Sequence, residues 1–342
     1  CRPDIKAIVH AHPPALVSFS ITRQIPDSRA IFTTCSICGS IGYAPYAMPG
    51  SQALGEKVAR EFSKGYDVII MENHGAVAGG ADIADAFQRF ESTENCAGAL
   101  IGANLLGKPD FLTDEQVKEF GDGLKYSFPE TDLSVKVTFD ENKRNEILKF
   151  VQRGCRQGLM TSSTGTVSLR CDGNNFLVTP ENIPVWALQA GDIVKITDGK
   201  CEAGKSPDHM VRILQAIYEN HPGINSIILA QPVNLMAFGI SGAPFDVHTI
   251  PESLMFLKDV VMLPFRTEFD KLTELIVSQC ATSNAMILRH NSVLTTGNSL
   301  LQAYDRLEIA EFGAKSLIMS KTIGEFKPIS SRQAEETSKM YP

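Results

Sequence analysis

The amino-acid sequence predicts an α/β protein made of two tandem domains. Short apolar runs typical of buried strands, at residues 67–71 and 224–230, alternate with segments of helical apolar spacing, at residues 51–63 and 81–106. A chain of 342 residues suits two domains better than one. An internal duplication is the third observation, and it sets the number of domains at two.

Two blocks of the chain recur in the same order. Residues 1–21 agree with residues 220–240 at eight of 21 positions, with an offset of 219. A second block recurs with an offset of 217, and its identical pairs are Ala86/Ala303, Arg89/Arg306, Glu91/Glu308, Glu94/Glu311, Ala97/Ala314, Leu100/Leu317 and Ile101/Ile318. The sequence therefore predicts a first repeat at residues 1–130 and a second repeat at residues 138–342.

The two repeats differ at their N-terminal ends. The second repeat has about 80 residues, roughly 138–219, before its equivalent of Cys1. The first repeat begins almost directly on a strand. We therefore expect the first repeat to lack its front part. The segment 128–138 has the character of a linker.

In the first repeat, local patterns predict each element in turn. Residues 7–12 form an apolar strand that two prolines end. Residues 28–49 have the composition of an irregular stretch, and residues 113–116 form a capping box that opens a helix. Leu54, Val58 and Phe62 indicate a helix at 51–63. A second helix is expected at 81–106, and the residues expected on its buried side are Ile83, Phe87, Phe90, Ala97, Leu100 and Ile101.

The second repeat begins with elements that the first repeat lacks. An amphipathic helix starts at Asp140, with Ile147, Leu148 and Val151 on one side. Three β-like segments and a helix precede the strand at 224–230, and they span residues 165–170, 175–179, 192–197 and 207–219.

Composition narrows the classes of function. The formal net charge is −7 and the pI is near 5.6, which argues against nucleic-acid binding and against a basic membrane patch. The sequence has no run of 18 apolar residues, so it predicts no membrane span and no membrane partner. No secretory signal is predicted. Eight scattered cysteines fit a reducing compartment, so we expect a cytoplasmic protein.

Three histidines at strand ends are the candidate metal ligands. His10 and His12 lie two residues apart at the end of the first strand, where alternate side chains point to the same side. His74 stands in the turn that follows the strand at 67–71. An isolated His-x-His pair is also compatible with a polar strand end that binds nothing.

The duplication provides an internal comparison for these histidines. In the second repeat, His10 aligns with Leu229, His12 with Gln231 and His74 with Asn291. His290 is one place out of register, so its side chain is expected to point elsewhere. The first repeat alone keeps three nitrogen ligands, and this asymmetry favours a metal site there over a structural role.

Five short motifs follow one another in the first repeat: Arg2-Pro3-Asp4, the strand ending in His10 and His12, Ala44-Pro45-Tyr46-Ala47, Asn73-His74-Gly75 and the long helix with Glu91 and Glu94. In this order the first repeat resembles the class II aldolase/adducin family, the zinc-dependent sugar-phosphate aldolases. The resemblance implies that His10, His12 and His74 bind Zn²⁺ or another divalent ion. The implied fold is a pair of three-layer α/β/α domains around mainly antiparallel sheets, and the implied assembly is a homo-oligomer with active sites at subunit interfaces.

The second repeat resembles the front half of the same family but departs from it at the functional positions. Residues 163–170 stand at its phosphate turn and residues 179–182 at its Thr-Pro motif. At its phosphate and base motif, Asp208 and His209 replace two serines and Met210 replaces the general-base glutamate. Methionine cannot exchange a proton and Asp208 would repel a phosphate, so we expect a non-catalytic partner domain.

The first hypothesis is a zinc-dependent aldolase-like lyase that cleaves a sugar phosphate through a metal-stabilised enediolate, with its site on the first repeat. Three imidazole ligands leave a coordination position open, as in catalytic zinc sites. The general base is not identified: Glu72 is close in sequence to His74, and Glu91 and Glu94 are candidates for orienting the site or for surface pairing. The family's proton-donor tyrosine is not found near Ile31. The alternatives are an epimerase or dehydratase of the same family, or a non-catalytic adducin-like structural module.

Overall fold

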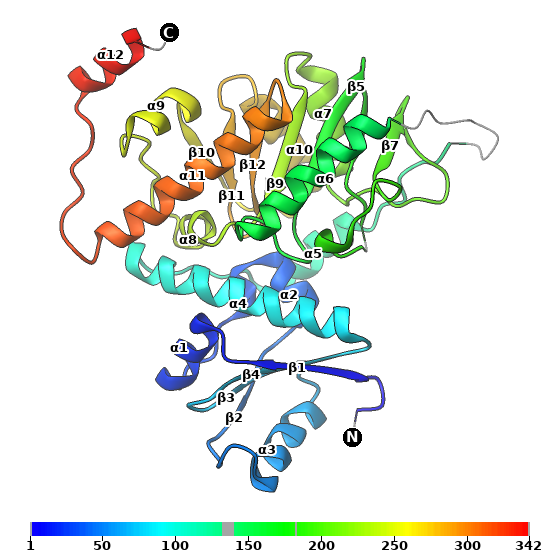
Figure 1. Ribbon diagram of the computed structural model, residues 1–342, viewed down its shortest axis with the longest axis vertical. Coiled ribbons are helices and arrows are strands. Elements are labelled where there is room, and N and C mark those ends of the chain that lie inside the picture. The colour runs from blue at the N-terminus through cyan, green and yellow to red at the C-terminus, as the bar shows by residue number, and fades with distance from the viewer. Residues whose placement is uncertain (1, 132–139, 182, 341–342) are drawn as a thin grey trace.

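The computed structural model describes residues 2–131, 140–181 and 183–340, and it contains two sheets (Figure 1). The predicted linker at 128–138 lies mostly outside these residues. The first sheet has four strands in the spatial order β1-β4-β3-β2, with β3 and β2 parallel and the other neighbours antiparallel. Its strands are β1 (Ala7–Ala11), β2 (Gly42–Ala44), β3 (Val68–Met71) and β4 (Gly75–Gly80).

The second sheet has eight strands, and one half of it repeats the first sheet. The order is β10-β11-β12-β9-β5-β6-β7-β8, and its first four strands reproduce β2-β3-β4-β1 in order and in relative direction. The strands are β5 (Thr166–Asp172), β6 (Asn175–Val178), β7 (Val194–Thr197), β8 (Lys200–Cys201), β9 (Ser226–Ala230), β10 (Val260–Leu263), β11 (Ala285–Leu288) and β12 (Ser292–Gly297).

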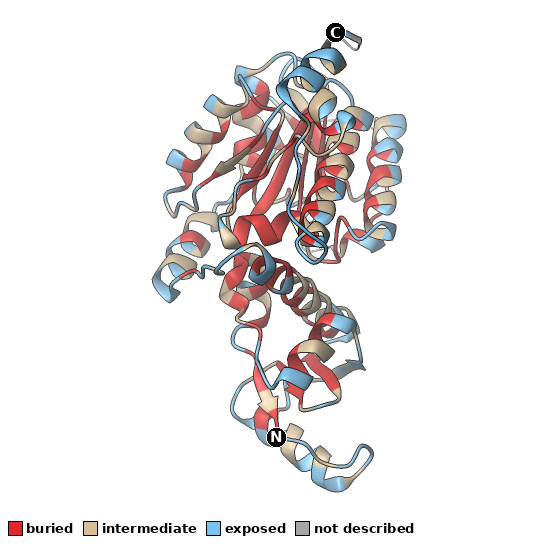
Figure 2. Cartoon of the chain, turned by 90° about the vertical axis from the view of Figure 1, so that its left-hand side faces the viewer, coloured by how far each residue is buried: buried red, intermediate tan, exposed pale blue. Residues whose placement is uncertain are grey.

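Helices cover both faces of each sheet, which confirms the predicted three-layer α/β/α class (Figure 1). The first-repeat helices are α1 (Pro14–Thr22), α2 (Phe32–Cys38), α3 (Gln52–Ser63), α4 (Ile83–Leu106) and α5 (Asp114–Leu124). The remaining helices are α6 (Glu141–Arg156), α7 (Val211–Asn220), α8 (Val233–Ser241), α9 (Pro251–Leu257), α10 (Phe269–Gln279), α11 (Leu300–Ser320) and α12 (Ser331–Met340). Figure 2 shows the buried residues concentrated on the strands and on the helix sides that face them.

Helix α4 lies between the two halves of the molecule and packs closely on α8 (Figure 1). A Cβ added at Gly102 would stand 2.9 Å from Ala237 Cβ, and one at Gly98 would stand 3.1 Å from Val233 Cγ1. Small residues on α4 therefore let the two helix backbones approach each other. A second link joins α2 to the β11–β12 turn, where the Phe32 backbone N–H donates to His290 O at 2.8 Å.

Three expectations about elements are corrected. Ile83, Phe87 and Ile101 of α4 are exposed, whereas Phe90, Ala97 and Leu100 are buried; α4 packs against elements of both repeats, so a single apolar stripe does not describe its buried surface.

The stretch 28–49 is not irregular, because it contains α2 and β2. The seven-residue helix α2 is too short for a clear periodic signal and is held by tertiary contacts such as the ring pair Phe32–Phe120. The helix expected at 207–219 begins later, at Val211, because residues 208–210 form a turn in which the Met210 N–H donates to Asp208 Oδ1.

Candidate metal centre

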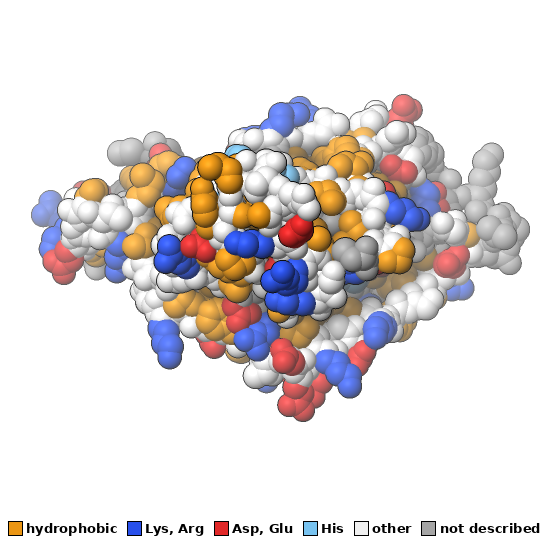
Figure 3. Space-filling view, turned by 90° about the horizontal axis from the view of Figure 1, so that it is seen from below, with side chains coloured by type: hydrophobic (Ala, Val, Ile, Leu, Met, Phe, Trp, Pro, Cys, Tyr) orange, Lys and Arg blue, Asp and Glu red, His pale blue; other side chains and the backbone are white. Residues whose placement is uncertain are grey.

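The three predicted histidines come together at one end of the first sheet. Any two of the ligand nitrogens of His10, His12 and His74 lie within 4.8 Å of each other. The ring centroids are 4.8 Å apart for His10–His12, 5.0 Å for His10–His74 and 4.8 Å for His12–His74. In a view from the first-repeat end, histidine side chains reach the molecular surface (Figure 3).

Strand register explains why residues far apart in the sequence meet here. Strand β1 pairs antiparallel with β4, and Ala11 lies opposite Ala76. The end of β1 therefore adjoins the short turn between β3 and β4, which carries His74. A Cβ on Gly75 would stand 2.6 Å from His12 Cδ2 and 2.6 Å from Ala11 O. Only glycine leaves room for the His12 ring to pack against this turn.

The backbone of the turn directs the His74 side chain. Asn73 has a φ of 52°, a left-handed conformation that asparagine tolerates better than most residues. His290 takes the same conformation in the second repeat, with a φ of 58°. It therefore occupies the place of Asn73, and its buried ring hydrogen-bonds Ala30 O through Nδ1 at 3.0 Å. The expected change of direction for His290 is confirmed.

Hydrogen bonding and burial prepare the imidazoles for metal binding. His10 Nδ1 lies 2.9 Å from Ala76 O, so this nitrogen carries the proton and donates it, leaving Nε2 free as a ligand. Partial burial, together with the neighbouring His10 and His12, lowers the pKa of His74. A lowered pKa favours the neutral imidazole that a metal ion requires.

The donor set fits a divalent transition-metal ion. Three imidazole nitrogens close together suit zinc and leave positions open for a substrate. The Gly75 contact with His12 is a second feature that fits, since it provides room for a ring that a larger residue would displace. Within the described residues, no carboxylate belongs to this group. The site thus offers three candidate metal ligands, and no carboxylate base adjoins them among the described residues.

Each carboxylate considered from the sequence as a base or helper has another partner. Glu72 forms an ion pair with Arg23 at 2.9 Å and accepts from the Tyr46 N–H at 3.0 Å; the Tyr46 N–H and Arg23 lower its pKa. Glu91 accepts from the Ser162 N–H at 2.6 Å. Glu72 and Glu91 are therefore engaged with groups other than the histidines.

Glu94 has a structural role that its local sequence pattern does not reveal. Its two carboxylate oxygens accept from the backbone N–H groups of Ala15 and Leu16, at 3.0 and 2.9 Å, at the start of α1. The N-cap residue of α1 is Pro13, whose side chain makes no capping hydrogen bond. Glu311 does the same for α8, where it accepts from the N–H groups at residues 234 and 235. The repetition of this carboxylate is the signal that could have predicted a capping role.

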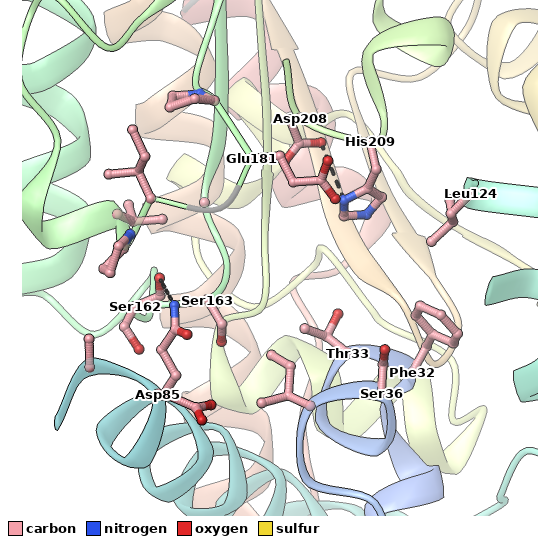
Figure 4. Close-up of a pocket in the computed structure, with 18 of the residues that line it drawn as sticks. Phe32, Thr33, Ser36, Asp85, Leu124, Ser162, Ser163, Glu181, Asp208 and His209 are labelled. Carbon is pink, nitrogen blue, oxygen red and sulfur yellow. Dashed lines mark hydrogen bonds and ion pairs between the residues drawn. The ribbon is translucent and has the colours of Figure 1, made fainter. Parts of the chain in front are cut away.

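The family-like segments of the second repeat meet around a different cavity, of about 790 Å³, that faces the first repeat (Figure 4). One side of it is lined by the turn at 162–165, by residues 180–181 and 183–185, and by the pair Asp208–His209. Asp208 accepts from Thr166 Oγ1 at 2.8 Å, and His209 Nδ1 lies 4.0 Å from Asp208 Oδ1. Asn182 of the expected Thr-Pro motif lies outside the described residues.

The opposite side of this cavity is formed by residues of the first repeat that the sequence patterns did not single out. Thr33 and Ser36 project from α2, and Asp85 from α4 (Figure 4). Met210, which stands at the expected position of the family's general base, is buried in the core and is not among the residues that line the cavity.

A family model confirms what the geometry indicates. The model described as Class II Aldolase and Adducin N-terminal domain matches residues 1–101 and 145–318. The chain belongs to this family. The first matched segment runs from β1 into α4, and the second runs from α6 into α11. The family's domain is therefore matched in two separate parts of one polypeptide.

Named relatives include aldolases and decarboxylases. An L-fuculose phosphate aldolase of Methanococcus vannielii is 28% identical over 160 residues, covering 46% of this chain and 84% of the relative. A 3-oxo-tetronate 4-phosphate decarboxylase of Haemophilus influenzae is 33% identical over 123 residues, covering 34% of this chain and 57% of the relative.

Solved structures show the same fold. A putative aldolase/epimerase/decarboxylase from Klebsiella pneumoniae matches with a TM-score of 0.53 and 24% identity, covering 59% of this chain and 100% of that chain. An L-fuculose 1-phosphate aldolase matches with a TM-score of 0.54 and 19% identity, covering 60% of this chain and 97% of that chain.

Among the described residues, no helix is both long enough and apolar enough to span a membrane.

Proposed function

We propose that this protein is a metal-dependent lyase that acts on a sugar phosphate at His10, His12 and His74, with zinc as the metal. The observation that carries the proposal is the convergence of three imidazoles in the first repeat, at positions where the second repeat has no metal ligand. The aldolase and decarboxylase names among the relatives support a reaction at a C–C bond next to a carbonyl.

The chain's own residues provide the binding and orientation. Ala76 O holds the His10 ring, Gly75 makes room for His12, and the turn at Asn73 directs His74 toward both. A divalent ion held there supplies a Lewis acid that polarises the substrate carbonyl. The exposure of His10 and His12 leaves the substrate a path to the ion.

Proton transfer is the step that lacks a group, because among the described residues of the first repeat no carboxylate lies beside the three histidines. Glu72, Glu91 and Glu94 are held by Arg23 or by backbone N–H groups, as described above. We therefore expect residues 1–342 alone to be inactive or very slow, well below the usual range of roughly 1–1000 per second. A same-family epimerase, dehydratase or decarboxylase would use the same ligands and is the nearest alternative.

The second repeat supports a different role for its half of the chain. Leu229, Gln231 and Asn291 replace the ligands, and Met210 replaces the base. This favours a non-catalytic, adducin-like structural module for that half, assembled with the first repeat in a cytoplasmic homo-oligomer. A metal-free first repeat would extend the module hypothesis to the whole chain.

Elemental analysis of the purified protein tests the proposal. We expect close to one zinc or other divalent ion per chain, and we expect His12→Ala to lose it. His248→Ala is the matched control, because His248 lies half-exposed beside Asp246, away from the three ligands. Protein without metal, or His12→Ala with unchanged metal, would contradict the assignment. Release of aldehyde from L-fuculose 1-phosphate at roughly 1–1000 per second would contradict the expectation that residues 1–342 alone are inactive or very slow.

A further inference from the structure

The β3–β4 turn, which carries His74, is fastened to two neighbouring segments by one carboxylate. Glu72 Oε1 lies 2.9 Å from Arg23 Nε at the C-terminal end of α1. Glu72 Oε2 accepts from the Tyr46 N–H at 3.0 Å, just after β2. The Glu72 side chain is only 16% exposed, so it lies between these segments and not in solvent.

Backbone hydrogen bonds follow the same two connections. The Glu72 N–H donates to Ala44 O at 2.9 Å, and the Asn73 N–H donates to Ser20 O at 3.4 Å. Ser20 O also accepts from the Arg23 N–H, at 3.3 Å. The end of α1 and the turn therefore share a carbonyl acceptor as well as the ion pair.

Helix α1 links this contact to the other two candidate ligands. The helix begins at Pro14, two residues after His12, and its buried Leu16 and Phe19 pack into the core. A packed helix of nine residues moves as a rigid element. Fixing the turn to the end of α1 therefore fixes the place of His74 relative to the strand that carries His12.

The corresponding positions of the second repeat differ together. Glu72 aligns with Arg289 at the offset of 217, and Arg23 aligns with Gly242 at the offset of 219. Arg23 and Gly242 are both left-handed C-cap residues of their helices, with φ values of 58° and 68°. Where the first repeat has an anion in the turn and a cation at the helix end, the second has a cation in the turn and no side chain at the helix end.

Arg289 makes the same connection by different chemistry. Its Nε donates to Gly239 O at 3.1 Å near the end of α8, and its Nη2 pairs with Asp110 at 3.1 Å. A Cβ on Gly242 would stand 3.4 Å from Arg289 Cζ, so the bare helix end leaves room for the guanidinium. Gly239 aligns with Ser20, whose carbonyl accepts from the turn of the first repeat. In both repeats a charged residue of the turn thus binds the end of the preceding helix.

We propose that Glu72 is a positioning residue of the candidate metal centre, because its ion pair with Arg23 fixes the turn that aims His74 at the other two imidazoles. This inference deepens the proposed function and rests on it. Solvent screens an exposed ion pair, so such pairs contribute little to stability, and the Arg23 side chain is 71% exposed. Groups that orient a ligand, in contrast, typically change metal affinity by roughly 10- to 100-fold. The pair should therefore affect metal affinity much more than stability.

Cobalt(II) titration of the full chain is the test, because the visible absorption of bound cobalt depends on the geometry of its ligands. We expect Glu72→Gln to weaken cobalt binding by roughly tenfold or more and to change the absorption of the bound ion. Asp270→Asn is the matched control, because it removes an ion pair of 2.7 Å with Arg212 in the second repeat. The control should bind cobalt normally, and the urea midpoints of the two variants should shift by similar small amounts.

The pair of the second repeat provides a rescue experiment. Glu72→Arg places two guanidinium groups together and should weaken cobalt binding more than Glu72→Gln does. Combining Glu72→Arg with Arg23→Gly reproduces the pairing of Arg289 with Gly242. The double variant should improve cobalt binding by roughly fivefold or more over Glu72→Arg alone.

Three results overturn this inference while the proposed function stands. The first is unchanged cobalt affinity and absorption in Glu72→Gln when the unmodified protein binds cobalt. The second is a double variant that binds no better than Glu72→Arg. The third is a large fall in the urea midpoint of Glu72→Gln that accompanies its loss of affinity, because the residue would then act on the whole fold. An unmodified protein that binds neither cobalt nor zinc overturns the proposed function, and this inference with it.

Discussion

Gly75 and His12 lie so close together that a Cβ on residue 75 would stand 2.6 Å from His12 Cδ2. This contact couples the β3–β4 turn to the end of β1, and with it His74 to His12. In the second repeat, Ser292 takes the place of Gly75 and Gln231 the place of His12. The glycine and the histidine are thus present together in one repeat and absent together from the other.

The first prediction follows from this contact. Gly75→Ala should push the His12 ring away from His10 and His74 and weaken zinc binding by roughly 10- to 100-fold, the usual effect of disturbing the groups that orient a ligand. Zinc affinity measured by competition with a chelating dye checks it. Gly107→Ala is the control, because nothing lies within 4 Å of a Cβ there. Equal affinities in both variants would contradict the packing argument.

The second prediction concerns the duplicated helix caps. Glu94→Ala removes the acceptor of two N–H groups at the start of α1, and Glu311→Ala does the same at α8. Each change should lower the free energy of unfolding by about 1–2 kcal/mol, measured by urea denaturation. The exposed Glu119→Ala should have little effect. A Glu94→Ala protein of unchanged stability would mean that the carboxylate does not act as a cap.

The third prediction concerns pH. Burial lowers the pKa of His290 below its ordinary value of 6.5. The unfolded chain therefore binds a proton at this residue more readily than the folded chain does, and protonation favours unfolding. The stability that neutral His290 contributes to the folded protein is thus present above pH 6.5 and is lost as the pH falls below it. Urea midpoints between pH 7.5 and pH 5 should fall less steeply for His290→Asn than for the unchanged protein. Parallel profiles would show that His290 titrates equally in both states.

The fourth prediction concerns the α4–α8 contact between the repeats. A Cβ at Gly102 would already stand 2.9 Å from Ala237 Cβ, so the larger side chain of Gly102→Val should force the helices apart. We expect a loss of about 1–3 kcal/mol in the free energy of unfolding. Gly55→Val places the same residue in α3, where nothing lies within 4 Å of the Cβ, and separates crowding from helix propensity. An equal loss in both variants would argue against tight α4–α8 packing.

Much of the fold could be predicted because its signals are local. Residues 7–12 and 67–71 carry strand-like apolar runs, and Ser51 and Thr113 cap the helices that follow them. Periodicity could not predict the exposure of Ile83 and Phe87, because it shows which residues share a side of a helix and not which neighbours cover that side.

The candidate site divides in the same way. The residue types, the two-residue spacing of His10 and His12 and the loss of all three histidines from the second repeat are features of the sequence. The meeting of His74 with them depends on the β1–β4 register and on the approach that Gly75 permits. Glu94 illustrates the limit, because its position in the sequence suits a helper of the site and its two hydrogen bonds make it a helix cap.

By itself the sequence determined that this protein is a duplicated α/β chain of the class II aldolase/adducin family, with three candidate metal ligands in one copy. Tertiary structure alone decided that the three imidazoles lie within 4.8 Å of each other and that the nearby carboxylates have other partners. The physical reason is that residue type and spacing act over a few residues, whereas register, close packing and the covering of a face depend on segments distant in the chain.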